Sequence, residues 1–322
     1  MKIGNTELKY GIMLAPMAGF SDYAMRRICR ECGCEYSVTE MVSAKAVVYG
    51  DKKTLTLAKI THDEGPVALQ IFGSEPTVMA EAAGVLSSPI GDGVSPVAID
   101  INMGCPVPKV FNNGEGSALM KSPELIYDIV KSVSSAISLP CTVKMRLGID
   151  SGHINITECA KAAEEGGARL LTVHGRTRVQ LYAGKADMSH IKNVKKCLQI
   201  PVIANGDILS AEDAMRVLEQ TGADGIAIGR GAVGNPFVFS EIISHLEGKS
   251  YSEPTLDTRI DTALRQLSYA IRDKGEECAV REARKQIAQY FKGFHGAAEL
   301  RAAINTALTF SDVHSALKTL LV

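Results

Sequence analysis

The stretch that decides the fold is Asp100-Ile101-Asn102-Met103-Gly104-Cys105-Pro106, which follows the short apolar run Val97-Ala98-Ile99. A buried parallel strand has this pattern when its carboxyl end opens into a cleft, because the chain turns abruptly polar and glycine-containing. Gly104 permits backbone angles that other residues resist, and Pro106 fixes the next ones, so the Cys105 side chain has a defined direction. Taken alone, Cys105 is either a thiol aimed into a site or a small core residue.

The chain is longer than a domain with one hydrophobic core of average size. The 322 residues suit a barrel with an appendage, and the formal net charge of -1 leaves room only for a local nucleic-acid-binding patch. Eight cysteines without a secretory leader indicate free thiols in a reducing compartment. The sequence has no apolar run of the roughly 20 residues that cross a bilayer, so we expect a cytoplasmic protein with no membrane partner. Nothing in it demands a protein partner, and we expect a monomer.

Short β-rich runs alternate with helical patterns along most of the chain. The runs are Ile12–Ala15, Tyr36–Thr39, Val67–Phe72, Val97–Ile101, Cys141–Arg146, Leu170–His174, Val202–Asn205 and Gly225–Gly229. Helices between them begin at Ser122-Pro123-Glu124 and at Ser210-Ala211-Glu212-Asp213, where an N-cap serine precedes first-turn acids. Eight alternations favour an α/β fold of the (β/α)8 TIM barrel type, with a doubly wound open sheet as the alternative. The open sheet usually carries a glycine fingerprint after its first strand, and Ala15-Pro16-Met17-Ala18-Gly19 is not one.

From about Glu253 no strand pattern returns. Helical spacing covers Thr255–Lys274, Glu276–Phe294 and Ala297–Phe310. We therefore predict a barrel domain over residues 1–250 and a small all-helical domain over residues 251–322. The basic residues of the helical domain that lie among aromatic ones are Arg281, Arg284, Lys285 and Lys292. They form either a solvated face over an aromatic core or a surface that binds phosphates and stacks bases.

In a barrel, the loops after the strands converge on one face and build the site. The candidate residues at these exits, in chain order, are Pro16, Met17, Ala18, Gln70, Asn102, Cys105, Lys144, Arg146, His174, Arg176, Arg178, Asn205, Gly206, Asp207, Gly229, Arg230 and Gly231.

The last two exits predict a phosphate site. Glycine turns after the seventh and eighth strands leave backbone N–H groups free, and Arg230 can close over a phosphate with paired donors. Lys144 points to the barrel centre, where an unpartnered ammonium is costly. A bound electron-rich ring or a salt bridge to Asp100 would offset that cost. His174 could bind a phosphate, contact substrate or cap a strand end, and we place it in the cofactor-binding set.

A metal site is not predicted. Cys29-x-x-Cys32-x-Cys34 superficially resembles a ligand run, but it falls on the first helix and its end, with no second pair at finger spacing. A serine triad is unsupported too, because the sequence lacks a nucleophile-elbow pattern.

In combination, the motifs of this chain resemble those of the tRNA-dihydrouridine synthase family, most of all its bacterial B type. The barrel motifs are Ala15–Asp22, Leu69–Gly73, Asp100–Pro106, Val143–Arg146, His174–Arg178, Ile203–Ile208 and Ala227–Gly231. Arg281-x-x-Arg284-Lys285 and Tyr290-Phe291-Lys292-Gly293 are similar to the family's helical domain. The chain departs from the family's pattern at Ala24-Met25 and at Met188, and both differences look like changes in packing.

The resemblance implies an FMN-dependent oxidoreductase that saturates the C5–C6 bond of particular uridines in tRNA, with NADPH reducing the flavin. Pro16, Met17 and Ala18 would line the flavin, Gln70 and Lys144 would contact its polar edge, and Asn205, Gly206, Asp207, Gly229 and Arg230 would hold its phosphate end. The flavin would give a hydride to C6, and Cys105 would give a proton to C5. The implied tRNA contacts are Asn102, Lys109, Arg176, Arg178, Arg284 and Lys285.

Three other functions stay open at this point. The first is an FMN barrel that acts on a small enone, which would not need the helical domain. The second is a flavin-free phosphate-binding barrel such as an isomerase or aldolase. The third is an RNA-binding protein with an inactive barrel.

Overall fold

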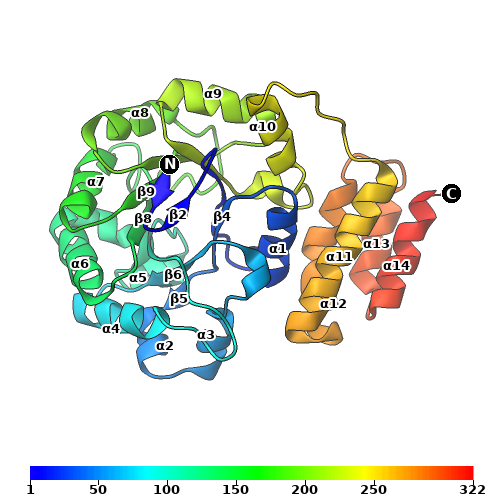
Figure 1. The fold of residues 1–322 in the computed structure, drawn as a ribbon, viewed down its shortest axis with the longest axis horizontal. Coiled ribbons are helices and arrows are strands. Elements are labelled where there is room, and N and C mark those ends of the chain that lie inside the picture. The colour runs from blue at the N-terminus through cyan, green and yellow to red at the C-terminus, as the bar shows by residue number, and fades with distance from the viewer. Residues whose placement is uncertain (322) are drawn as a thin grey trace.

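A closed barrel of parallel strands forms the body of the computed structural model, which describes residues 1–321 (Figure 1). In these residues its eight strands are β3 (Ile12–Leu14), β4 (Tyr36–Val38), β6 (Val67–Phe72), β7 (Ala98–Met103), β8 (Cys141–Met145), β9 (Leu170–His174), β10 (Val202–Asn205) and β11 (Gly225–Ile228). Neighbours in the chain pair in parallel, β11 pairs with β3, and β4 pairs with β6, which closes the ring. The predicted TIM barrel is confirmed, and the open sheet is excluded.

Helices connect the strands and surround the barrel (Figure 1). They are α1 (Tyr23–Glu31), α2 (Ala44–Val48), α3 (Lys52–Leu57), α4 (Pro76–Leu86), α5 (Pro108–Asn112), α6 (Pro123–Ala136), α7 (Ile156–Glu165), α8 (Met188–Cys197), α9 (Ala211–Thr221) and α10 (Val238–Leu246), with 3-10 turns η1 (His62–Glu64), η2 (Gly116–Lys121) and η3 (Arg230–Ala232). The Ser122 hydroxyl accepts from the Leu125 N–H at the start of α6, and Ser210 accepts from the Asp213 N–H at the start of α9. Both predicted helix starts are confirmed.

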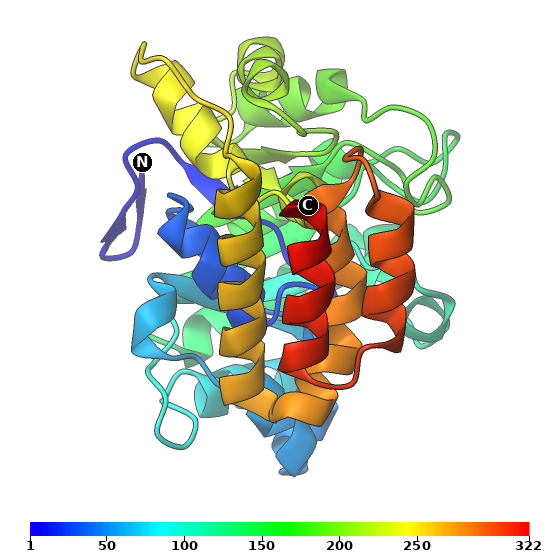
Figure 2. The same cartoon turned by 90° about the vertical axis from the view of Figure 1, so that its right-hand side faces the viewer.

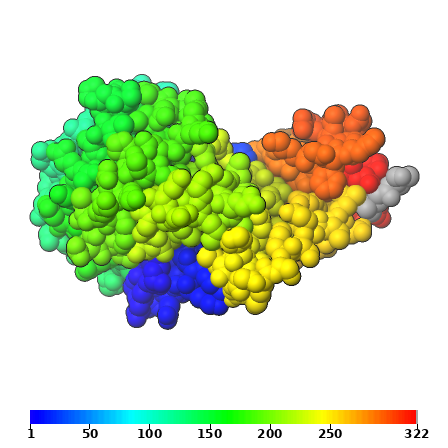
Figure 3. All heavy atoms as spheres, turned by 90° about the horizontal axis from the view of Figure 1, so that it is seen from above, coloured from blue at the N-terminus to red at the C-terminus, as the bar shows by residue number. Residues whose placement is uncertain are grey.

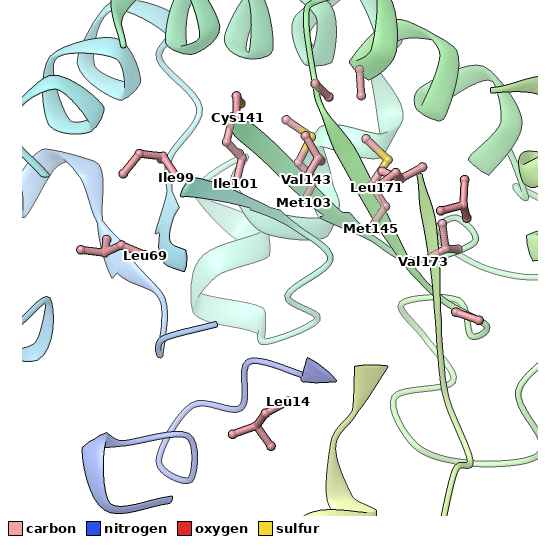
Figure 4. Close-up of a cluster of buried hydrophobic side chains, with 14 of the residues drawn as sticks. Leu14, Leu69, Ile99, Ile101, Met103, Cys141, Val143, Met145, Leu171 and Val173 are labelled. Atoms are coloured by element: carbon pink, nitrogen blue, oxygen red, sulfur yellow. The ribbon is translucent and has the colours of Figure 1, made fainter. Parts of the chain in front are cut away.

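Side chains alternate between the two faces of each strand, and this alternation separates core from site. On β7, Ile99, Ile101 and Met103 are fully buried in the apolar cluster shared with the surrounding helices (Figure 4). Asp100 and Asn102 lie between them in sequence and therefore face the inside of the barrel. By the same alternation, the polar residues that face inward from the other strands include Gln70, Thr142, Lys144, Thr172 and His174.

A hairpin fills the amino end of the barrel. β1 (Lys2–Ile3) pairs with β2 (Thr6–Glu7), and Ile3 and Leu8 join an apolar cluster with Met13 and Leu170 inside the ring. Neither this hairpin nor β5 (Val42–Ser43), which pairs with β6, was predicted, because two-residue strands carry no periodicity. With the amino end filled, room for a ligand lies at the carboxyl ends of the strands.

Residues 256–321 form a layer of helices beside the barrel (Figure 2). They are α11 (Leu256–Lys274), α12 (Glu276–Ile287), η4 (Ala288–Phe291), α13 (Ala297–Thr306), α14 (Phe310–Lys318) and η5 (Thr319–Leu321). The predicted helix 276–294 ends early, in η4. The predicted helix 297–310 is also wrong in extent, because Thr309 and Asp312 form a capping box that starts the separate helix α14. No helix of residues 1–321 is long and apolar enough to cross a membrane.

The helical region packs against α1 and forms a lobe beside the barrel (Figure 3). Ala24 of α1 packs with Ala270 of α11 and Ala279 of α12, where small side chains allow close approach. Ion pairs border this contact. Lys274 Nζ lies 2.8 Å from the Asp22 carboxylate, and further along α1 the Arg265 guanidinium lies 2.7 Å from the Glu31 carboxylate.

Candidate active site

Strand register brings the inward polar side chains side by side. Gln70 on β6 is paired with Asp100 on β7, and Asn102 on β7 is paired with Lys144 on β8. Residues at paired positions of adjacent strands project to the same side of a sheet. Amide, carboxylate and ammonium groups are therefore gathered near the carboxyl end of the barrel.

A cavity of about 660 Å³ opens at this end. Most of the predicted site residues line it: Pro16, Met17, Ala18, Gln70, Asn102, Cys105, Lys144, His174, Asn205, Gly206, Asp207, Gly229, Arg230 and Lys285. Lys109, Arg176, Arg178 and Arg284 are not among the lining residues. Lys285 comes from α12, so the helical region contributes to the rim.

Cys105 lies on the cavity wall in a loop held by hydrogen bonds. The side-chain oxygen of Asn102 accepts from the N–H of Gly104 at 3.2 Å and of Cys105 at 2.8 Å, and Ser117 Oγ donates to the Cys105 carbonyl at 2.7 Å. Cys105 is 9% exposed, and burial raises the pKa of its thiol, opposed by the Val107 N–H and by the positive charge of Arg146. The thiol is therefore protonated near neutral pH, as a proton donor must be.

Lys144 carries a positive charge into the barrel. Burial lowers its pKa to about 8, with Arg146 lowering it further and Asp100 acting in the opposite direction. Its Nζ donates to Asn205 Oδ1 at 3.1 Å. In residues 1–321 no ion pair joins Lys144 to Asp100, so the salt bridge considered from the sequence does not form. The ammonium keeps donors free for an electron-rich ligand.

Two glycines let the loops after β9, β10 and β11 fit closely together. Gly206 has φ of +131°, and a Cβ there would lie 2.8 Å from the Cβ of Ala186. A Cβ on Gly231 would lie 2.2 Å from the carbonyl oxygen of Ile208 in the neighbouring turn. Any larger residue would push these loops apart, so both positions require glycine for close packing as well as for the turn. The backbone at this end of the cavity can approach a phosphate closely.

Arginines surround the same end. The Asp207 carboxylate pairs with Arg176 at 2.8 Å and with Arg230 at 3.3 Å. Arg176 is buried, whereas the Arg230 side chain is about half exposed and lies over the Tyr182 ring, 4.6 Å from its centroid. Asp207 therefore orients both guanidinium groups, and Arg230 has donors available at the rim.

His174 is a neutral group among these cations. Burial lowers the pKa of its imidazole well below the ordinary value, and the charges of Lys144, Arg146, Arg176 and Arg230 lower it further. Its Nε2 lies 3.5 Å from Nη1 of Arg176. Since a guanidinium only donates, Nε2 is the accepting nitrogen and Nδ1 carries the hydrogen. The accumulated positive charge makes this part of the cavity suited to an anionic group.

One structural role was missed from the sequence. Arg146 was noted at a strand exit without a function, and its buried guanidinium donates to the carbonyl oxygens of Gly104 at 2.8 Å and of Thr177 and Leu181 at 3.0 Å each. It thereby joins the Cys105 loop to the loop after β9. The available signal was its spacing of two residues from Lys144, which puts both on one face of β8.

The predicted residues outside the cavity have other contacts. Arg178 stacks on Phe111, with its guanidinium carbon 3.6 Å from the ring centroid, at the end of the Cys105 loop. Arg176 donates to the carbonyls of Ala183 and Gly184 as well as to Asp207, and Arg284 donates to the Ala307 carbonyl at 2.5 Å. Lys109 is exposed on α5. Buried Arg176 and half-buried Arg284 thus hold loops together.

The fold and the cavity place the protein in the class of (β/α)8-barrel enzymes, whose active sites lie at the carboxyl ends of the strands. A family model described as "Dihydrouridine synthase (Dus)" matches residues 13–321. The chain belongs to the dihydrouridine synthase family, which confirms the predicted resemblance and oxidoreductase class.

Named relatives cover nearly the whole chain. A "Probable tRNA-dihydrouridine synthase" of Rickettsia conorii is 41% identical over 95% of this chain and 91% of its own length. The "tRNA-dihydrouridine synthase B" of Pasteurella multocida is 40% identical over 95% and 91%, and that of Xanthomonas axonopodis pv. citri is 40% identical over 96% and 92%.

A solved structure shares the fold alone. Histamine dehydrogenase from Rhizobium sp. 4-9 superposes with a TM-score of 0.58 and 14% identity, over 84% of this chain. This chain spans half the length of that protein.

Proposed function

We propose that this protein reduces the C5–C6 double bond of specific uridines in tRNA to dihydrouridine, using FMN as bound cofactor and NADPH as reductant. The observation that carries the proposal is a buried, protonated thiol, Cys105, that lines the same cavity as Gln70, Asn102 and Lys144. An acid and a set of ring-binding donors in one cavity fit the reduction of a double bond conjugated to a carbonyl. The names of the relatives support tRNA as the substrate.

The lining residues fit FMN in both of its parts. Pro16, Met17 and Ala18 line the cavity and would contact a ring system, and Lys144 would stabilise negative charge on it. Gly229 lines the cavity without a side chain, so a bound group could approach its backbone. Asn205, Gly206 and Arg230 would hold the phosphate, with Asp207 orienting Arg230 and neutral His174 donating from Nδ1. When bound, FMN supplies the hydride after reduction by NADPH.

Cys105 would complete the reaction as the proton donor. Its protonated thiol would transfer H⁺ to C5 as C6 receives hydride, leaving a thiolate. The Val107 N–H and the charge of Arg146 both lower the thiol pKa, so they would stabilise that thiolate. Arg146 also holds the Gly104 carbonyl, which fixes the loop during transfer.

The tRNA would approach over the rim of the cavity. Its target base is stacked in folded RNA and must be extruded into the barrel mouth, at a cost of a few kcal/mol. We propose that Asn102 contacts the base and that Lys109, Arg178 and Lys285 bind phosphates and offset this cost. Arg176 and Arg284 would act indirectly, through the loops that they hold. Because Lys285 belongs to the helical region, the proposal favours a macromolecular substrate over a small enone.

The decisive test is Cys105→Ala, with Cys197→Ala on exposed α8 as matched control. We expect Cys105→Ala to bind FMN and tRNA but to form dihydrouridine at least about 100-fold more slowly, because an acid of this kind contributes roughly that factor. The measurement is single-turnover reoxidation of the NADPH-reduced protein by tRNA, followed by nucleoside analysis. Wild-type rates in Cys105→Ala would refute the acid role, and a protein that takes up no flavin would refute the proposed function itself.

A further inference from the structure

A continuous line of buried side-chain hydrogen bonds joins Asp100 to the Cys105 loop; we call it the amide ladder, and it consists of Asp100, Gln70 and Asn102. Asp100 is 3% exposed and accepts from Thr142 Oγ1 at 2.6 Å and from Gln70 Nε2 at 2.7 Å. Gln70 Oε1 in turn accepts from Asn102 Nδ2 at 2.9 Å. Asn102 Oδ1 then accepts from the Gly104 and Cys105 N–H groups.

The direction of the amide ladder is fixed at both ends. Backbone N–H groups can only donate, so Asn102 must turn its oxygen to the Cys105 loop and its nitrogen to Gln70. Gln70 must then present its oxygen to Asn102 and its nitrogen to Asp100. A carboxylate can only accept, which is the partner that this nitrogen requires. The two ends select the same orientation of both amides, so neither can flip without leaving buried groups unpaired.

We propose that Asp100 is a positioning residue that, through Gln70 and Asn102, holds the Cys105 loop and the direction of both amides. Within residues 1–321, Asp100 makes no hydrogen bond to the Cys105 loop itself. It acts on the loop through the side chains of Gln70 and Asn102. Lys144, the nearest cation on β8, bonds to Asn205 instead, so the carboxylate is reserved for Gln70 and Thr142. Burial raises the Asp100 pKa, while its two hydrogen bonds and the charge of Lys144 lower it and help to keep the acceptor form.

The amide ladder also determines what the cavity offers to a ligand. Each amide nitrogen carries two hydrogens and uses one within the ladder, so Gln70 and Asn102 each retain one N–H for the cavity they line. The Asn102 oxygen accepts two hydrogen bonds and is fully engaged, whereas the Gln70 oxygen accepts one. This part of the inference rests on the proposed function: the free N–H of each amide would meet a ring atom that accepts, such as a carbonyl oxygen or an unprotonated ring nitrogen.

The first experiment measures the rate at which iodoacetamide alkylates Cys105, by peptide mass spectrometry on purified full-length protein. Asp100→Ala removes the acceptor, so the loop should open more often and Cys105 should react at least about fivefold faster. Asp100→Asn keeps an oxygen for Gln70 and an N–H for the Thr142 hydroxyl, so its rate should stay within about twofold of wild type. Thr142→Val is the matched control. It removes the other Asp100 bond but leaves the ladder intact, so it should lower Tm without exposing Cys105.

The second experiment reverses the ladder and keeps the design testable if Asp100→Ala does not fold. Asn102→Asp puts a carboxylate against Gln70 Oε1 and should lower Tm by roughly 5 °C or more. Adding Asp100→Asn lets both bonds of Gln70 run backwards: residue 100 donates to Gln70, and Gln70 donates to residue 102. The double variant should recover most of the lost Tm and the slow alkylation of Cys105. Asp100→Ala with Asn102→Asp removes the same charge but supplies no donor, and it should not recover.

A double variant no better than Asn102→Asp, or an unchanged Cys105 rate in folded Asp100→Ala, would overturn the positioning role. Neither measurement needs NADPH or tRNA. The inference can therefore fail while dihydrouridine formation stands, and it can hold if the proposed function fails.

Discussion

Lys144 is a residue whose buried charge costs folding free energy but is available to bind a ligand. Burial lowers its pKa to about 8, from 10.5, and its Nζ donates to the neutral amide of Asn205. An ammonium is usually buried only with a carboxylate partner, and here the nearby carboxylate, Asp100, is bonded to Gln70 and Thr142. The incomplete pairing leaves the charge available to a bound anion or ring.

This arrangement predicts an unusual pH dependence of stability. Between pH 8 and 10.5 the unfolded chain binds a proton at Lys144 that the folded protein has lost, so the cost of burial declines as pH rises through this range. Lys144→Met should therefore raise the unfolding free energy of cofactor-free protein by about 2 kcal/mol near neutral pH. The gain should shrink towards pH 10.5. Denaturant titrations at both pH values measure it.

The control is Lys185→Met, which removes an equal charge from an exposed site in the loop between β9 and α8. Its stability should stay close to wild type at both pH values. A loss of stability in Lys144→Met near neutral pH would contradict the assignment of Lys144 as a strained, ligand-directed group. Weaker flavin binding should accompany the gain in stability.

At the scale of elements, α1 connects the cavity lip, which is the loop of residues 15–22 after β3, to the rest of the molecule. Arg26 of α1 is buried against Glu64 of η1, with its Nε 2.6 Å from the carboxylate, and its Nη1 donates to the Ser21 carbonyl at 2.7 Å. Glu64 also accepts from the Thr61 N–H at 2.6 Å. One charged pair thus fixes the lip, the helix and the η1 turn together.

Breaking this pair should be expensive. Glu64→Gln leaves the Arg26 guanidinium buried without a counter-charge, and we expect a loss of about 3 kcal/mol in unfolding free energy. The matched change on α1 is Glu31→Gln, whose partner Arg265 has 44% of its side chain exposed. That pair should contribute less than about 1 kcal/mol. Equal losses in the two variants, measured by urea denaturation, would contradict the importance of burial here.

At the scale of the whole molecule, the helical region supplies part of the cavity rim. Buried hydrogen bonds join its elements: Gln266 of α11 donates to Gln286 of α12 at 2.7 Å, and Tyr290 donates to Gln266 at 2.6 Å. Gln286 Nε2 in turn donates to the Phe20 carbonyl at 3.4 Å, which connects the region to the loop after β3. Lys285, next to Gln286, lies 5.0 Å from the centroid of the Phe20 ring on the lip. The Lys285 ammonium of the helical region therefore lies beside the loop between β3 and α1 of the barrel.

Lys285→Ala should weaken tRNA binding more than it slows catalysis. Loss of one phosphate contact should raise the apparent KM for tRNA several-fold and reduce the slope of log affinity against log salt by about 0.7–0.9. Steady-state assays over a range of salt concentrations measure both. Lys2→Ala, on the hairpin that fills the opposite end of the barrel, is the control and should change neither quantity. An unchanged salt slope in Lys285→Ala would exclude a phosphate contact.

The sequence by itself determined the strands and most of the cavity lining. The runs that became β6, β9 and β10 begin and end where the pattern predicts, because alternation and glycine turns are properties of neighbouring residues. The residues after those strands lie in the cavity because a barrel directs all its strand ends to one face. Knowledge of the fold class was sufficient to place Cys105, Lys144 and Asn205 together.

Only the tertiary structure decided which partner each polar group has. Lys144 bonds to Asn205, 61 positions away, rather than to Asp100, and Arg176 is enclosed by backbone carbonyls instead of facing the cavity. The Asp100 carboxylate controls the Cys105 loop through Gln70, which is 30 residues earlier in the chain. Periodicity specifies the face on which a side chain lies, but a hydrogen-bond partner depends on the distances and directions that packing sets between distant segments.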